Sequence, residues 1–215
     1  MGEPGAHDIT LLRHGESVGN QESRWQGQAD YSLTEKGRKQ AAALVKRWLA
    51  EKRSFDRIFS SPLKRAFETA EIIAAGLQAP LESDPIWMER DIGEFAGMTS
   101  DEVDRRVPRG GSITPFAPLI GEQGEGDWEL FLRAGQALHR ILTRTPGKFL
   151  VVSHGGLLNQ VMYAVVGITP SANPSGPRFR FENTGYAHLV YHARSHRWQI
   201  LALNDHAHWN GSDSD

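Results

Sequence analysis

Two short apolar segments of this chain each end in a His-Gly pair, and this shared ending constrains the fold more than any other feature. Residues 9–12 lead into Arg13-His14-Gly15, and residues 149–152 lead into Ser153-His154-Gly155. Short apolar runs separated by segments with helical periodicity are typical of a parallel sheet covered by helices. Such sheets bind their ligands beyond the carboxyl ends of the strands. If the two strands are parallel neighbours, both histidines lie at one site.

The rest of the chain continues this alternation of strands and helices. We predict an α/β fold, a three-layer α/β/α sandwich with a mostly parallel central sheet. Apolar residues at helical spacing, with Thr34 as an N-cap and Pro62 in a first turn, predict helices at residues 33–51, 65–75, 99–107, 127–143 and 156–166. Strands are expected at residues 8–12, 55–60, 148–153, 178–182, 187–192 and 198–203, with a shorter strand within 81–88, and a Gly- and Pro-rich loop at 108–126.

The length of 215 residues fits one domain. We expect a single domain over residues 1–215, with a folded core at about 8–209 and flexible ends at 1–7 and 211–215. The first residues lack the apolar segment of a secretion signal, and no apolar run is long enough to cross a bilayer. The expectation is therefore a cytoplasmic protein with no membrane partner.

The composition excludes several classes of site. The chain has 24 Lys and Arg against 26 Asp and Glu, a formal charge of −2, so it has no overall basic field for nucleic acid. It contains no cysteine, which excludes a disulfide framework, a cysteine-bound metal and a thiolate nucleophile. Any covalent chemistry must use another nucleophile.

Four segments carry side chains suited to an anion and to proton transfer. Arg13 beside His14 follows the first strand, and a second histidine, His154, follows the late strand. Arg65 is expected in the first turn of a helix, where free backbone N–H groups already favour an anion. Glu89 lies in a Gly-containing loop after a strand and could donate a proton. Each residue alone is more typical of an ordinary surface or structural position, and only their combination in one chain indicates an anion-binding site.

In that combination the chain resembles the histidine phosphatase superfamily, also called the phosphoglycerate mutase-like family. The resemblance extends from Ile9 to about Trp209. It is carried, in chain order, by Arg13-His14-Gly15-Glu16-Ser17 with Asn20, Gln26-Gly27, Leu33-Thr34-Glu35-Lys36-Gly37, Ser60-Ser61-Pro62 with Arg65, Thr69 and Ala70, Glu89 with Gly93, Gly124-Glu125 with Arg133, and Ser153-His154-Gly155-Gly156.

The resemblance implies a role for each matching residue. His14 would attack phosphorus and become a phosphohistidine, with Gly15 or a neighbour accepting a hydrogen bond from its second ring nitrogen. Arg13, Arg65 and His154 would surround the phosphoryl group, and with both histidines protonated the site would carry up to four positive charges. Glu89 would act as general acid and then as general base. Further phosphate contacts would come from Asn20 and the Gly155 N–H group, and substrate contacts from Ser17, Gln26 and Gly27.

The implied reaction needs neither a metal nor another cofactor, because the arginines provide the charge. The implied partner is a small phosphorylated metabolite, and the oligomeric state is left open, a homodimer included. The pair His206 and His208 could suggest a metal site, but we interpret it as capping or packing. Arg178 and Arg180 could approach a substrate or lie on a solvated strand edge.

Three activities are compatible with the resemblance. Mutases of the family carry Glu-Arg-His-Tyr where this chain has Glu89-Arg90-Asp91-Ile92, and the arginines that could bind a second phosphate, Arg105-Arg106, lie on a predicted solvated helix face. We therefore favour a phosphomonoesterase. The alternative is a 2,3-bisphosphoglycerate-dependent phosphoglycerate mutase. A catalytically inactive binding module is less favoured, because all five central residues are present.

Overall fold

The computed structural model describes residues 5–106, 114, 116–118, 122–170 and 177–209, and its centre is a six-stranded sheet. The strands lie in the order β3 (Leu81–Ser83), β2 (Arg57–Ser60), β4 (Lys148–Ser153), β1 (Ala6–Arg13), β5 (Tyr186–His192) and β6 (Arg197–Asp205). The pairs β3–β2, β2–β4 and β4–β1 are parallel, and β5 is antiparallel to both β1 and β6. The predicted mostly parallel sheet is confirmed.

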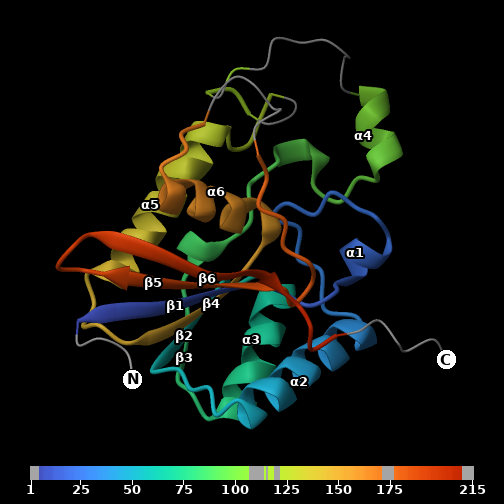
Figure 1. Ribbon diagram of the computed structural model, residues 1–215. Coiled ribbons are helices and arrows are strands. Elements are labelled where there is room, and N and C mark those ends of the chain that lie inside the picture. Colours follow the sequence, from blue (N-terminus) through green and yellow to red (C-terminus); the bar gives the residue numbers. More distant parts are fainter. Residues whose placement is uncertain (1–4, 107–113, 115, 119–121, 171–176, 210–215) are drawn as a thin grey trace.

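Helices cover both faces of this sheet (Figure 1). One face carries α2 (Glu35–Ala50) and α3 (Lys64–Leu77), and the other carries α5 (Asp127–Leu142) and α6 (Gly155–Val166). The short helices α1 (Val18–Gln21) and α4 (Ser100–Arg106) and the 3-10 turns η1 (Pro85–Trp87) and η2 (Gly93–Phe95) belong to the loops beyond the parallel strands. The predicted three-layer α/β/α arrangement is confirmed.

The alternation of side chains along the central strands produces two separate cores. Ile9 and Leu11 of β1 pack in the cluster beside α5 and α6, whereas Leu12 packs in the cluster beside α2 and α3. In β4, Val151 and Val152 divide in the same way. Because successive side chains of a strand point to opposite faces, a strand buried on both sides needs an unbroken apolar run. This requirement explains why β1 and β4 were the clearest strands in the sequence.

The two strands that end in His-Gly are neighbours, as predicted. Arg13 of β1 lies in register with Ser153 of β4, and the N–H group of His14 donates to the Ser153 carbonyl at 3.0 Å. The segments that follow β1 and β4 therefore leave the sheet side by side at the same edge. This register brings His14 and His154 together.

The predicted strand at residues 178–182 is wrong. The described residues of this segment form no strand, because other groups satisfy its backbone. The Phe179 N–H group donates to the Asn159 side chain, and the Glu182 N–H group donates to the Asn204 side chain. The Phe181 carbonyl accepts from Arg13. A segment whose backbone groups bond to side chains is not available for a β ladder.

The short strand expected within residues 81–88 is confirmed at Leu81–Ser83, and it ends there because Asp84 caps the turn η1 and Pro85 has no N–H group for a ladder. Two boundaries differ from the prediction. Helix α3 begins at Lys64, so Pro62 lies before its first turn. Strand β1 begins at Ala6, and His7, expected in a flexible end, is 2% exposed. Part of the predicted loop at 108–126 lies outside the described residues. Every helix in the described parts of the chain is too short or too polar to span a membrane.

Candidate active site

His14 lies directly after β1 with its ring tautomer fixed by a backbone contact. Its Nδ1 atom is 2.7 Å from the carbonyl oxygen of Gly15, and the side chain is 3% exposed. A carbonyl only accepts hydrogen bonds, so Nδ1 carries the proton and Nε2 carries the lone pair. This contact confirms the expected carbonyl partner. The Gly15 N–H group in turn donates to the Thr69 hydroxyl, which ties the turn to α3.

His154 lies beside His14 at the end of the neighbouring strand. The centroids of the two rings are 5.1 Å apart, and the His154 side chain is fully buried as the N-cap residue of α6. Its Nε2 atom is 2.8 Å from the Ser61 hydroxyl, which also accepts from the Leu63 N–H group. The Ser61 proton can therefore go to Nε2, which leaves Nδ1 as a donor. Nδ1 is buried and has no hydrogen-bond partner among the described residues.

Two arginines flank the histidines, and backbone carbonyls hold each guanidinium. Arg65, 1% exposed, donates to the carbonyls of Gly27 and Ala29 at 2.7 and 2.8 Å, and Arg13 donates to the Phe181 carbonyl at 2.7 Å. The Nε atoms of both arginines are buried without a partner in the described part of the chain. Native proteins rarely leave buried donors unpaired, so these two N–H groups, together with the Nδ1–H group of His154, indicate a binding site for an anion.

The surroundings keep both imidazoles neutral. Burial lowers the pKa of His14 well below its usual value of 6.5, and the charges of Arg65 and Arg13 lower it further. Burial and the same arginines lower the pKa of His154 in the same direction. Burial also lowers the pKa of Arg65 to about 10, so its guanidinium still carries a full charge at neutral pH. With neutral rings, the four groups carry two positive charges at pH 7, not the four counted with protonated histidines.

Glu89 lies at the N-terminus of α6, next to the same cluster. Its two carboxylate oxygens accept hydrogen bonds from the N–H groups of Gly156 and Leu157, each at 3.0 Å, and one of them also accepts from Arg90 N–H at 2.8 Å. Its charge raises the pKa of Arg13 and of Arg65 against the effect of their burial. The structure thus brings the five central residues together, in the arrangement that the sequence predicted.

The lesser predicted residues have mainly local contacts. Ser17 and Asn20 form a capping box at α1, and the Ser17 hydroxyl also lies 2.8 Å from Gln26 Oε1. Gly27 holds Arg65 and has φ of +48°, a conformation that favours glycine. Gly155 is the first residue of α6, and an added Cβ there would lie 3.9 Å from Arg13 Nε. Contacts of these residues with a phosphate or substrate stay predictions.

Several residues of the site lacked any predicted role. Ser61 partners His154, and Thr69 anchors the Gly15 turn. Asn183 donates to the carbonyl of His14 at 3.1 Å and to the Asn20 side chain at 3.2 Å. Arg133, on α5, bonds the backbone around Glu89. Ser61, Thr69 and Arg133 were part of the family resemblance, but Asn183 had no signal in the sequence.

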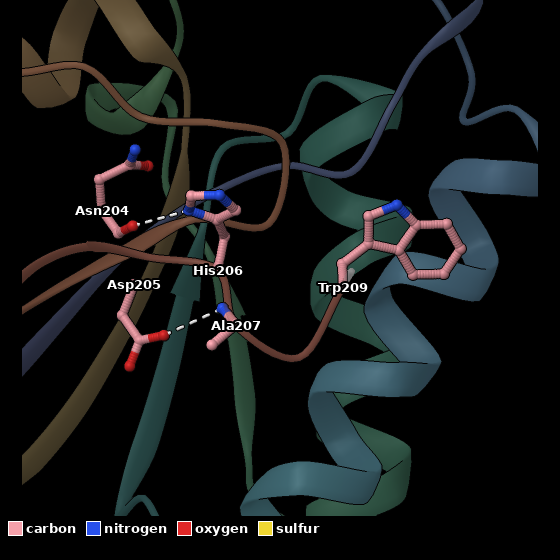
Figure 2. A pocket seen from close by; sticks show the side chains of 5 residues that line it. All are labelled: Asn204, Asp205, His206, Ala207 and Trp209. Atoms are coloured by element: carbon pink, nitrogen blue, oxygen red, sulfur yellow. Dashed lines mark hydrogen bonds between the residues drawn. The ribbon is translucent and has the colours of Figure 1, made fainter. Parts of the chain in front are cut away.

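His206 and His208 lie in the segment after β6, and His206 lines a surface depression with Asn204, Asp205, Ala207 and Trp209 (Figure 2). His206 Nδ1 donates to the Asn204 carbonyl at 2.9 Å, and His208 Nε2 lies 2.9 Å from the Thr184 hydroxyl. Both contacts agree with the interpretation as packing residues. Among the described residues, no group of three His, Asp or Glu side chains is arranged to hold a metal ion.

Comparisons with known proteins place this geometry in a family. Residues 9–206 match the family model of the histidine phosphatase superfamily (branch 1). A probable phosphoglycerate mutase, GpmB, of Cronobacter sakazakii is 32% identical over 93% of this chain and 94% of its own length. A metal-independent phosphoserine phosphatase of Arabidopsis thaliana is 30% identical over 94% of this chain and 82% of its own length.

A solved structure shows the same fold over nearly the whole length. The Bacillus stearothermophilus protein YhfR superposes with a TM-score of 0.81 at 30% identity, covering 94% of this chain and 98% of its own. One of these relatives is named as a mutase and another as a phosphatase. The comparisons therefore do not distinguish between these two reactions.

Proposed function

Because the chain belongs to the histidine phosphatase superfamily (branch 1), we propose that it is a metal-independent phosphomonoesterase that hydrolyses a small phosphorylated metabolite through a phosphohistidine on His14. One observation carries this proposal. His14 is buried and neutral, with a fixed tautomer, beside two arginines whose Nε–H groups have no partner among the described residues. Such a site supplies both a nucleophile and donors for a phosphate.

In the first step, His14 Nε2 attacks phosphorus. Nucleophilic attack needs the lone pair of a neutral imidazole, and the lowered pKa of His14 provides it across the neutral pH range. The hydrogen bond from Nδ1 to the Gly15 carbonyl stabilises the positive charge that develops on the ring. The N–P bond forms while the bond from phosphorus to the leaving oxygen breaks.

The arginines and His154 stabilise the phosphoryl group during this transfer. Phosphoryl transfer depends mainly on positioning and on compensation of charge on the equatorial oxygens. Backbone carbonyls hold the guanidinium groups of Arg13 and Arg65, and we assign their buried Nε–H groups, which have no partner among the described residues, to the phosphoryl oxygens. The buried Nδ1–H group of His154 is a third donor to the same oxygens.

Glu89 moves the proton in both steps. In its protonated form it donates a proton to the leaving alkoxide and becomes the carboxylate whose charge acts on Arg13 and Arg65. This carboxylate takes a proton from the water that attacks the phosphohistidine, which restores the acid. The N–P bond then breaks, orthophosphate leaves, and His14 returns to its neutral form. Atoms and charge balance without a metal or a co-reactant. A well-placed general acid contributes ~10²- to 10⁴-fold to such a step.

Hydrolysis is favoured over the mutase reaction by the surroundings of the site. A mutase must bind a second phosphate, and the arginines proposed for this role, Arg105 and Arg106, are exposed on α4. Arg105 donates to the Asp101 carbonyl of its own helix. The mutase remains the alternative activity, because a relative carries that name over the same length.

A panel of phosphomonoesters tests the proposal. The purified protein is assayed for phosphate release from phosphoserine, phosphoglycerates, sugar phosphates and nitrophenyl phosphate, with and without 2,3-bisphosphoglycerate. The proposal expects phosphate release without bisphosphate and in the presence of a chelator. Exchange between 3- and 2-phosphoglycerate that requires bisphosphate would establish the mutase instead. A protein that binds orthophosphate but turns over no member of the panel would support the inactive binding module.

A further inference from the structure

The Arg133 side chain, on α5, donates five hydrogen bonds, and all of them go to the segment around Glu89 or to Glu125. Nη1 bonds the carbonyls of Ile86 and Met88 at 3.0 and 2.6 Å, and Nη2 bonds the carbonyl of Glu89 itself at 3.2 Å. Nε and Nη2 also bond the two carboxylate oxygens of Glu125, at 2.7 and 2.6 Å. A guanidinium has five N–H donors, so this set uses all of them.

Glu125 extends the same contact to the other side of Glu89. Its Oε2 atom accepts from the Asp91 N–H group at 2.9 Å, and its own N–H group donates to the Asp91 carbonyl at 2.8 Å. The backbone is therefore fixed at Ile86 and Met88 before Glu89 and at Asp91 after it. Both Arg133 and Glu125 are largely buried, with side chains 18% and 20% exposed.

We propose that Arg133, bound to Glu125, is the positioning residue for Glu89, fixing the backbone that aims its carboxyl group at the leaving oxygen. This inference rests on the proposed function, in which Glu89 transfers the proton. Arg133 does not touch the reacting atoms. It acts on the main chain of the acid, whereas the N–H groups of α6 act on its carboxylate.

The arrangement needs an arginine and not only a positive charge. A lysine has three donors on one atom and cannot bond a carboxylate through two parallel bonds while reaching three carbonyls. A displacement of about 1 Å in a catalytic group can cost about 10²-fold in rate, so loss of these contacts should be visible in the proton-transfer step.

Single-turnover release of the leaving group separates this role from general damage. Nitrophenolate leaves without protonation, whereas the alkoxide of an alkyl phosphate such as phosphoserine, or the best alkyl ester of the panel, needs the acid. In Arg133→Met we expect release from the alkyl ester to slow by about 10²-fold and release from nitrophenyl phosphate by less than about 3-fold. Inhibition by orthophosphate should change by less than about 3-fold, because Arg13 and Arg65 are untouched.

A double-mutant cycle with Glu89→Gln provides the decisive comparison. If Arg133 acts through Glu89, adding Arg133→Met to Glu89→Gln should slow alkyl ester release by less than about 3-fold more. Losses that multiply, or equal losses for both substrates in Arg133→Met alone, would overturn the positioning role while Glu89 keeps its own. Equal losses for both substrates in Glu89→Gln would overturn the role of Glu89 in the proposed function, and the positioning role with it.

Two further variants cover poor folding and general effects. Arg133→Lys keeps the charge, and we expect a leaving-group-dependent loss between those of wild type and Arg133→Met. Arg47→Met is the matched control, because Arg47 also forms a two-bond ion pair, with Asp205, and a bond to Glu51. It should lower thermal stability without any leaving-group dependence. The same dependence in Arg47→Met would overturn the assignment to Arg133.

Discussion

In the proposed reaction, the neutral and therefore nucleophilic form of His14 depends on burial and on the charges of Arg65 and Arg13. For a histidine on the surface, a substantial fraction of the molecules carries a protonated ring at pH 6, and a protonated ring cannot attack phosphorus. We expect His14→Ala to abolish turnover and the trapping of an acid-labile, base-stable phosphoprotein after rapid quenching. The measurement uses labelled nitrophenyl phosphate, since its release needs no acid.

The exposed His139, on α5, provides the matched control for this prediction. His139→Ala should trap as much phosphoprotein as the wild type. If His14→Ala traps as much phosphate as the wild type, another residue is the nucleophile.

Arg65 shows why the kind of cation matters at a single residue. Its two Nη atoms are used by the carbonyls of Gly27 and Ala29, and only a rigid fork can make these bonds and still present Nε–H. We expect Arg65→Lys to lower kcat/KM by about 10- to 10²-fold and to weaken inhibition by vanadate to a similar extent, since the one charge-assisted hydrogen bond from Nε–H is worth about 1.5–3 kcal/mol.

Arg38→Lys serves as the control, because Arg38 also donates to a backbone carbonyl, that of Leu33, but lies on the exposed side of α2. Its kcat/KM should stay within about 2-fold of wild type, as is usual for surface substitutions. Unchanged vanadate inhibition in Arg65→Lys would remove Arg65 from the phosphate site.

At this scale the sequence predicted the central residues but not how they are held. The carbonyl partner of His14 follows from the turn after β1, whereas its neutral ring depends on burial and on Arg65, which is distant in the chain. The partner of His154 is Ser61, between β2 and α3, and Glu89 is bound by α6, so these contacts form only in the folded protein. Ser17 and Asn20 bond to each other because they cap the short helix α1, a local requirement that the predicted substrate role did not take into account.

The N-terminus of α6 is the element that holds the acid. Its Gly156 N–H group bonds Glu89, and a Cβ added at Gly156 would lie 2.5 Å from Glu89 Oε1. We expect Gly156→Ala to displace the carboxylate and to slow single-turnover release from alkyl phosphates by at least about 10-fold. The fold should remain stable, because alanine favours a helix.

Gly135, in the middle of α5, is the matched glycine, since a Cβ added there meets nothing within 4 Å. Gly135→Ala should raise the free energy of unfolding by about 0.5–1 kcal/mol and leave the rate unchanged. An equally slow reaction in both variants would show that the effect of Gly156→Ala is not due to contact with Glu89.

Helices and strands with a strong apolar periodicity could be predicted from the sequence. Segments whose backbone groups bond to side chains from elsewhere in the chain could not. Strand β4 was predicted at its observed bounds, and α2 nearly so, because each buries one regular apolar pattern. Residues 178–182 alternate like a strand, yet Asn159 and Asn204 take their N–H groups. Nothing local in the sequence distinguishes an asparagine that competes for a backbone group from one on the surface.

Over the whole molecule, a chain of net charge −2 concentrates positive charge and neutral histidines at one edge of its sheet. The bulk composition argues against an overall basic field for nucleic acid, but it is silent on this local arrangement. Keeping two imidazoles neutral beside two guanidinium groups has a consequence for stability. The groups that serve the reaction make the folded state sensitive to acid.

The last prediction concerns that sensitivity. His14 and His154 have folded pKa values well below 6.5, and burial lowers the pKa of His208 to about 4. At a pH between the folded and the unfolded pKa of these histidines, the unfolded chain binds more protons than the folded protein. The free energy of unfolding is therefore highest above about pH 6.5. As the pH decreases below 6.5, it decreases by up to about 1.4 kcal/mol per pH unit for each histidine. Urea unfolding at pH 7.5, 6.5, 5.5 and 5.0 measures this slope.

Replacing a contributing histidine should flatten the slope. Between pH 6.5 and 5, we expect the free energy of unfolding of His154→Asn to change less steeply with pH than that of the wild type, by up to about 1.4 kcal/mol per pH unit. This difference in slope does not depend on the stability of the variant at pH 7.5. The exposed His139→Gln should keep the full slope, and carboxylates contribute mainly at lower pH because their unfolded pKa values lie near 4. An identical slope in wild type and His154→Asn would mean that His154 is protonated in the folded protein near pH 6. The site would then carry a third positive charge, and His154 would act on the phosphoryl group as a cation.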